Sequence, residues 1–126
     1  MASILRVDTL TDASSNNSTA MSTINQGTAK AWVNFTGITT TASRDSFNIS
    51  SITDNGTGLH TGLFTNNMSN ANFANSAMKQ AESTNADCTE YTTGSNSTSQ
   101  VVRQDVENNA TRDAANTNTL TFGDLA

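Results

Sequence analysis

The residue types that could carry out chemistry are scarce in this sequence. The chain of 126 residues has one His, His60, and one Cys, Cys88. A Ser–His–Asp triad would have to use His60, and no G-x-S-x-G turn surrounds any Ser. The single Cys excludes a disulfide within one chain and a Cys-based zinc site. We therefore expect His60 to be an ordinary strand residue beside a turn rather than a catalytic base.

The carboxylates are scattered along the chain and form no motif of a metal or nucleotide site. The sequence has no H-E-x-x-H, no repeated metal-ligand spacing and no Walker-type G-K-[ST]. We therefore expect no metal, no cofactor and no enzymatic activity. One alternative stays open, because a glycan-cleaving enzyme needs a pair of carboxylates and Asp105 and Glu107 alternate onto one strand face.

The segment Asp54-Asn55-Gly56-Thr57-Gly58 has three interpretations: a calcium loop, a phosphate-binding loop or a turn. An EF-hand loop needs a Glu at its twelfth position, where this chain has Thr65. Asn-Gly between alternating apolar residues is instead a strong signal of a β-hairpin, because a type I′ turn needs positive φ at both central positions. We predict a hairpin with Asn55 and Gly56 in the turn and a bulge at Gly58.

Alternation with a period of two recurs along the chain and predicts the strands that would carry these residues. The alternating positions are Phe47 and Ile49; Leu59, Thr61 and Leu63; Ala31, Val33 and Phe35, with Trp32 opposite; Ala71, Phe73 and Ala77; Val102 and Val106; and Leu120 and Phe122. Clusters of turn residues separate these segments. The pattern predicts an all-β protein, an antiparallel β-sandwich or jelly-roll-like domain over residues 29–126.

The composition limits the partners that the chain can bind. Thr, Asn and Ser number 22, 17 and 15, whereas only 34% of the residues are apolar. So little apolar material favours β structure in which neighbouring subunits supply part of the core. Six dispersed basic residues and a net charge of −5 exclude a phosphate-binding patch, so we expect no nucleic-acid partner. No segment predicts membrane insertion or classical export.

Residues 1–28 differ from the rest and predict an N-terminal arm. The segment "SILRVDTL" is extended, with Leu5 and Val7 on the face opposite Ile4. The polar segment "TDASSNNSTAMSTINQGTA" that follows is typical of a linker. Because an isolated strand is unstable, we expect the arm to add to a sheet of another protein or another copy, with Ile4, Leu5 and Val7 as docking residues. The alternative is an edge strand of the chain's own domain.

Several motifs carry a resemblance to a known family. "SILRVDTLTD", "AKAWVNFTG", "RDSFNISSITDNGTG", "MSNANFA" and "LTFGDL" resemble, in this order, small β-rich virion structural and tail-fibre-associated proteins of tailed phages that infect marine bacteria. The match covers almost the whole chain and is most specific from residue 29 to 58. It departs from the family pattern at Gly62 and is faint over residues 79–118. The resemblance implies a non-enzymatic structural protein of the virion, made in the host cytoplasm, that forms homo-oligomers such as trimers.

Two positions in the virion fit these features. In a tail fibre or appendage, the polar loops 83–99 and 107–119 would contact host surface glycans. In a capsid decoration protein, the arm would instead clamp neighbouring shell subunits on the head. The short chain without a shaft favours decoration or a small appendage over a complete fibre. In either position we expect Trp32, Phe35, Phe47 and Phe73 to be anchors of the core or of an interface.

Overall fold

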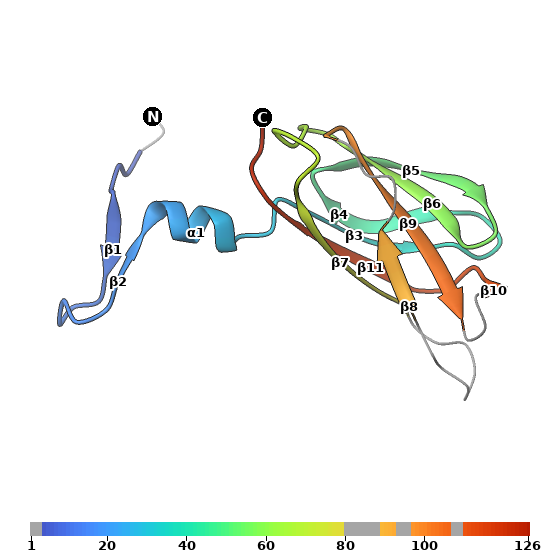
Figure 1. The fold of residues 1–126 in the computed structure, drawn as a ribbon, viewed down its shortest axis with the longest axis horizontal. Coiled ribbons are helices and arrows are strands. Elements are labelled where there is room, and N and C mark those ends of the chain that lie inside the picture. The colour runs from blue at the N-terminus through green and yellow to red at the C-terminus, as the bar shows by residue number, and fades with distance from the viewer. Residues whose placement is uncertain (1–3, 80–88, 93–96, 107–109) are drawn as a thin grey trace.

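The chain consists of an N-terminal arm and a two-layer β-sandwich (Figure 1). The computed structural model describes residues 4–79, 89–92, 97–106 and 110–126. The predicted all-β class and the antiparallel sandwich are confirmed, because strands build both layers and the described helix is one short segment in the arm.

The first layer is a four-stranded antiparallel sheet in the order β4-β3-β11-β7. These strands are β4 (Ala42–Phe47), β3 (Ala31–Thr36), β11 (Thr117–Phe122) and β7 (Ala74–Lys79). The second layer has the order β10-β9-β6-β5, and β8 also pairs with β9. These strands are β5 (Ile49–Gly56), β6 (Leu59–Phe64), β8 (Thr89–Thr92), β9 (Ser99–Val106) and β10 (Ala110–Thr111).

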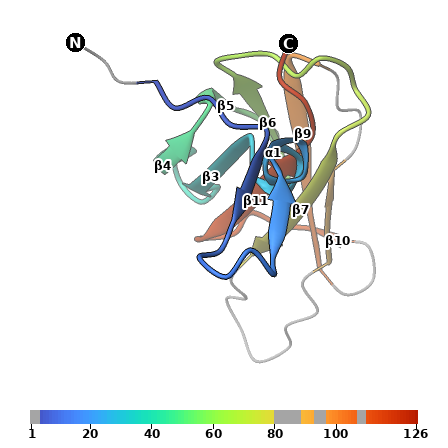
Figure 2. The ribbon, with the colours of Figure 1, turned by 90° about the vertical axis from the view of Figure 1, so that its left-hand side faces the viewer.

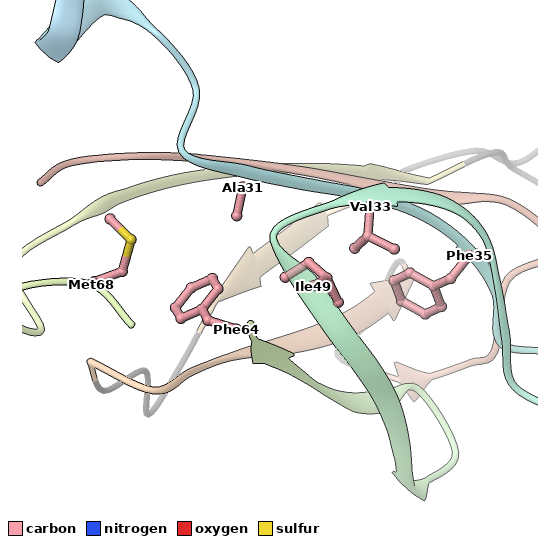
Figure 3. Close-up of a cluster of buried hydrophobic side chains, with 6 residues drawn as sticks. All are labelled: Ala31, Val33, Phe35, Ile49, Phe64 and Met68. Atoms are coloured by element: carbon pink, nitrogen blue, oxygen red, sulfur yellow. The ribbon is translucent and has the colours of Figure 1, made fainter. Parts of the chain in front are cut away.

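A small apolar core lies between the two layers. The alternation in β3 points Ala31, Val33 and Phe35 inward, where their exposed fractions are at most 1%. They meet Ile49 and Phe64 of the second sheet, as Figure 3 shows. Met68, from the loop after β6, completes the cluster, which consists of Ala31, Val33, Phe35, Ile49, Phe64 and Met68. The predicted inward face of β3 is therefore confirmed.

The strand β11 faces the core with its polar residues. Thr117, Thr119 and Thr121 are at most 1% exposed, whereas the apolar Leu120 and Phe122 alternate onto the outer face. The buried hydroxyls are satisfied within the interior: Gln100 Nε2 donates to Thr119 Oγ1 at 3.0 Å, and Thr121 Oγ1 lies 3.2 Å from Gln100 Oε1. A Thr methyl can pack while its hydroxyl joins this network, so β11 tolerates a polar inward face.

The expected common face of Phe47 and Ile49 is wrong, because the chain changes sheets between them. Asn48 lies between β4 and β5 with a φ of 58°, which is in the left-handed region that Asn tolerates. Its side chain holds the corner: Asn66 N–H donates to Asn48 Oδ1 at 2.7 Å, and Asn48 Nδ2 donates to Asn66 O at 3.0 Å. Ile49 is consequently buried, whereas Phe47 is 51% exposed.

The hairpin of β5 and β6 is confirmed, but the predicted turn at Asn55 and Gly56 is wrong. Gly56 pairs with Leu59, so the tip is Thr57–Gly58, and the register shifts between Asp54 and Gly56. A type I′ turn needs positive φ at both central residues, and Asn55 does not have it. The bulge expected at Gly58 thus falls at Asn55, and Gly58, with φ 68°, forms the turn.

The arm contains more structure than the predicted strand and linker. Its strands β1 (Thr9–Thr11) and β2 (Ser18–Ala20) form an antiparallel hairpin, followed by the helix α1 (Met21–Gly27). Asp12 organises the turn by accepting hydrogen bonds from Ser14 Oγ at 2.8 Å and Asn17 Nδ2 at 2.7 Å. The Asn17 bond, followed by the Ser14 bond, lowers the pKa of Asp12. The predicted linker is therefore an ordered hairpin and helix, which project from one end of the sandwich (Figures 1 and 2).

Candidate functional site

His60 lies inside the sandwich and not at its surface. It is 0% exposed, and its ring centroid lies 5.1 Å from that of Phe35. Within the described chain, neither Nδ1 nor Nε2 has a hydrogen-bond partner. Burial lowers the pKa of His60, against the opposing effect of Asp54 and Asp113. In this position the imidazole is neutral and has no surface through which to contact a substrate.

The acidic residues near the hairpin have structural partners. Asp54 Oδ1 accepts a hydrogen bond from Gly56 N–H at 2.8 Å, and Asp113 Oδ1 accepts one from Gly58 N–H at 2.6 Å. Asp113 therefore holds the tip of the β5–β6 hairpin. Over the described residues, His, Cys, Asp and Glu nowhere gather in a group of three that could hold a metal ion. Cys88 and Glu107 lie outside the described residues.

The three predicted docking residues of the arm are exposed. Ile4, Leu5 and Val7 expose 76%, 81% and 37% of their surface. The predicted extended strand forms only over Thr9–Thr11, and residues 4–7 pair with no strand of the described chain. No residue between 4 and 28 is buried, including those of the hairpin and of α1. An edge strand of the chain's own sandwich, the alternative for the arm, is therefore wrong, since β1 pairs with β2 alone.

The four aromatic residues that we expected to be anchors divide into two pairs. Phe35 is fully buried, and Phe73 packs on the core with its ring in a T-shaped contact with Phe64 at 5.6 Å. Trp32 and Phe47 instead lie on the outer face of the β4-β3-β11-β7 sheet, directly opposite each other across β3 and β4. For Phe47, half exposed, a place in the core is excluded.

Leu120 of β11 is the other direct neighbour of Trp32. We call Phe47, Trp32 and Leu120 the outer row; it crosses three adjacent strands. Met78 of β7, 61% exposed, is diagonal to Leu120, because it pairs with Asn118. Leu120 was not predicted to join this surface. The alternation in β11 places Leu120 on the face opposite Thr117, Thr119 and Thr121, but alternation alone does not indicate which of the two faces is buried.

A polar cluster lies beside the outer row on the same face. Asn34 Nδ2 lies 2.6 Å from both Asn116 Oδ1 and Asn118 Oδ1, and Arg44 Nη1 donates to Asn116 Oδ1 at 2.8 Å. Arg44 Nη2 also donates to Ala115 O. These bonds tie the loop before β11 to β3 and β4, and Arg44 gives the cluster one positive charge.

Comparison with protein-family models, with curated proteins and with solved structures finds no match to this chain. In the described part of the chain, no helix is both long enough and apolar enough to cross a membrane. Of the loops that we expected to contact glycans, residues 83–88, 93–96 and 107–109 lie outside the described residues. The candidate functional surfaces are therefore the arm and the outer row.

Proposed function

We propose that this chain is a non-enzymatic structural protein of a tailed-phage virion, a small component of a tail fibre or appendage. Its N-terminal arm joins it to the assembly, and its β-sandwich is the displayed domain. The chain forms a homo-oligomer, for which we expect a trimer, and contacts other virion proteins. The function is that of an assembly and display module, so the partners are proteins and, at the exposed loops, host surface glycans.

The main observation behind this proposal is that the arm has apolar residues but no apolar core of its own. A two-stranded hairpin of three-residue strands does not gain enough burial to be stable alone in water. Here the hairpin, α1 and the extended residues before them bury no side chain. Each large apolar side chain that becomes buried contributes about 1.5–3 kcal/mol. Docking of the arm on a partner would supply this burial, which supports an arm that works by association.

Among the described residues, the polar groups near the hairpin have structural environments, which supports a structural role. His60 is enclosed, and Asp54 and Asp113 hold the backbone of the hairpin. The arm could also clamp neighbouring subunits of a capsid, which is the alternative of a decoration protein on the head. A third function, a glycan-cleaving tail enzyme, requires activity of the isolated protein on host polysaccharide.

Locating the chain in the intact particle tests the proposal. Cryo-EM, or a gold-labelled antibody against the sandwich, should place it along the tail or at its tip. Label at symmetry positions of the head would favour the decoration protein and overturn the appendage. Absence from purified particles would overturn both.

A pair of charge substitutions tests the role of the arm. Leu5→Glu should reduce incorporation into virions at least about tenfold, since the loss of one buried Leu exceeds the 1.4 kcal/mol that corresponds to a factor of ten. Because Leu5 is 81% exposed, this change should leave the sandwich folded. Ser22→Glu adds the same charge to an exposed site in the first turn of α1, where a negative charge is tolerated, and should be incorporated normally. Equal incorporation of the two variants would refute docking through Leu5.

A further inference from the structure

The exposed end of the β5–β6 hairpin contains a side chain that can react with the backbone next to it. Asn55 is followed by Gly56, and this is the single Asn-Gly dipeptide in the sequence. The backbone nitrogen of Gly56 can attack Cγ of Asn55 to close a ring, and Gly hinders this attack least because it has no Cβ. Both residues are exposed, and among the described residues a Cβ built on Gly56 would meet no atom within 4 Å apart from its chain neighbours. Water therefore reaches the atoms that react.

The bulge in β5 places Asn55 outside the regular pairing of the hairpin. Asp54 pairs with His60 and Gly56 pairs with Leu59, so Asn55 is the extra residue between two paired ones. Because the ladder is locally disrupted at a bulge, rotation of the backbone at Asn55 disturbs fewer pairs there than in a regular strand. The bulge also favours Gly at position 56, where φ is 126°. The fold thus requires the residue that makes the dipeptide reactive.

Two side chains contact the atoms that would react. Asp54 Oδ1 accepts a hydrogen bond from the Gly56 N–H at 2.8 Å, a distance at which a base can take up the proton of the nucleophile. Asn55 Nδ2, the nitrogen that would leave, donates to Thr61 Oγ1 at 2.7 Å. The attacking and the leaving nitrogen therefore each have a polar partner in the folded hairpin.

We propose that Asn55 is a site of spontaneous modification, at which the folded chain converts its Asn side chain to Asp and isoaspartate. The bond between Gly56 N and Asn55 Cγ forms, and the bond between Cγ and Nδ2 breaks. The proton of Gly56 N passes to the Asp54 carboxylate and leaves with Nδ2 as ammonia. Water then opens the succinimide ring at either carbonyl: opening at Cγ gives Asp, and opening at the backbone carbonyl gives isoaspartate. This inference does not depend on the proposed function.

The products change the charge and the backbone of the hairpin end. Both add a carboxylate beside Asp54, and isoaspartate also adds a methylene to the backbone of the bulge. A carboxylate cannot donate the hydrogen bond that Asn55 Nδ2 makes to Thr61 Oγ1. Asp113 is a further carboxylate of this region, since it accepts a hydrogen bond from the Gly58 N–H at the tip. The modified chain is therefore a second, more acidic form with a less tightly held hairpin, and it accumulates with the age of the protein.

Peptide mapping by mass spectrometry tests the proposal on the full chain, incubated folded at pH 7.5 in water labelled with heavy oxygen. Hydrolysis of the ring places label at residue 55, and separation of the product peptides distinguishes Asp from isoaspartate, which direct hydrolysis of the amide does not form. Asn75 is the internal control, because Ser76 follows it and its Oδ1 accepts a hydrogen bond from Thr121 Oγ1 at 2.7 Å. We expect labelled product at residue 55 before any is detectable at residue 75.

A pair of isosteric substitutions tests the part played by Asp54. Asp54→Asn keeps an oxygen that can accept the Gly56 N–H but removes the base. It should slow the conversion of Asn55 at least about tenfold, less than the usual contribution of a general base because the site is exposed to water. Asp45→Asn is the matched control, since Asp45 is also exposed and accepts a backbone N–H, that of Ser46, at 2.8 Å. This control should react at the rate of the wild type, and circular dichroism checks that both variants keep their strands.

The same incubation in urea separates a reaction of the folded hairpin from one of the unfolded chain. Labelled Asp and isoaspartate at residue 55 of the folded chain, slowed by Asp54→Asn and not by Asp45→Asn, support the proposal. Asn55 that stays intact in the folded chain and reacts only in urea would show that the hairpin protects it, which overturns the proposal. Equal rates in the wild type and Asp54→Asn would also overturn it, because the folded arrangement would then contribute nothing to the reaction.

Discussion

Replacing His60 by Leu should stabilise the sandwich, which is unusual for a change to a fully buried residue. The neutral imidazole has one N–H donor and one acceptor nitrogen, and neither finds a partner among the described residues. An unmade hydrogen bond of a buried group costs about 1–3 kcal/mol. Leu has a similar volume, and repacking costs less than about 1.5 kcal/mol. The free energy of unfolding should therefore rise by about 1 kcal/mol at pH 7.5, since a gain of about 2 kcal/mol from the removed polar group exceeds a repacking cost of about 1 kcal/mol.

The stability gained by His60→Leu over the wild type should be larger at acidic pH, because His60 can bind a proton. Burial lowers the pKa of His60 below its ordinary value of 6.5, against the effect of Asp54 opposite it on β5 and of Asp113 before β11. Between the lowered pKa of His60 in the folded chain and its ordinary value of 6.5 in the unfolded chain, the unfolded chain binds a proton that the folded chain does not. The stability is therefore highest above pH 6.5 and decreases as the pH falls. The slope reaches about 1.4 kcal/mol per pH unit, and the loss at pH 5 is therefore at most about 2 kcal/mol.

Urea denaturation at pH 7.5 and 5.0, at one protein concentration and followed by circular dichroism, measures both effects. His60→Gln is the control, because it removes the titration but keeps a buried polar group. We expect His60→Leu to be more stable than the wild type at both pH values, with the larger difference at pH 5.0. His60→Gln should lose the pH dependence without the gain. A wild type whose stability changes between these pH values as much as that of His60→Leu would refute the reasoning, as would a loss of stability in His60→Leu at pH 7.5.

Three further predictions concern the change of sheet at Asn48, the apolar core and the hydrogen bonds of the buried Thr residues. In urea titrations, Asn48→Ala should be less stable than Asn48→Gly by about 1 kcal/mol, because both lose the same hydrogen bonds and only Ala is strained at positive φ; equal losses would contradict the strain. Phe35→Ala should cost about 3–5 kcal/mol in the same assay, whereas Phe47→Ala should cost less than about 1 kcal/mol in monomeric protein; similar losses would contradict their placement. Thr121→Val should lower the melting temperature by more than Thr121→Ser, because only Val removes the hydroxyl that lies 2.7 Å from Asn75 Oδ1 and 3.2 Å from Gln100 Oε1, a loss of about 1–3 kcal/mol. The reverse order would show that the methyl group matters more.

The sequence predicted the sandwich correctly because alternation with a period of two is a local property. In β3, apolar residues occupy the inward positions, so pattern and burial agree. In β11 the same pattern gave no way to decide which face is inside, because Thr can face a core when a partner such as Gln100 satisfies its hydroxyl. That partner comes from β9, at a distance along the chain that alternation does not report.

Two local predictions were wrong for a related reason. Asn48 and Asn55 are both polar residues in extended segments, yet Asn48 adopts positive φ and turns the chain into the second sheet, whereas Asn55 does not adopt it. What distinguishes them is the contact of Asn48 with Asn66 in the loop after β6. His60 is buried because it shares the inward face of β6 with Gly62 and Phe64, a face that was not predicted.

The polar interior and the apolar residues of the outer face both result from how the sequence distributes residues between the two faces of its strands. Among the described residues, the core has only a few large apolar side chains, and His60, Gln100 and the three Thr of β11 occupy the remaining inward positions. Such a core gains less from the hydrophobic effect than one of Leu and Ile, so a single sandwich of this size should be marginally stable. Leu120, Phe122 and Trp32 lie on the outer face of the sheet, where they are only partly buried. Association that covers this face would add burial to the folded state alone and raise its stability by mass action.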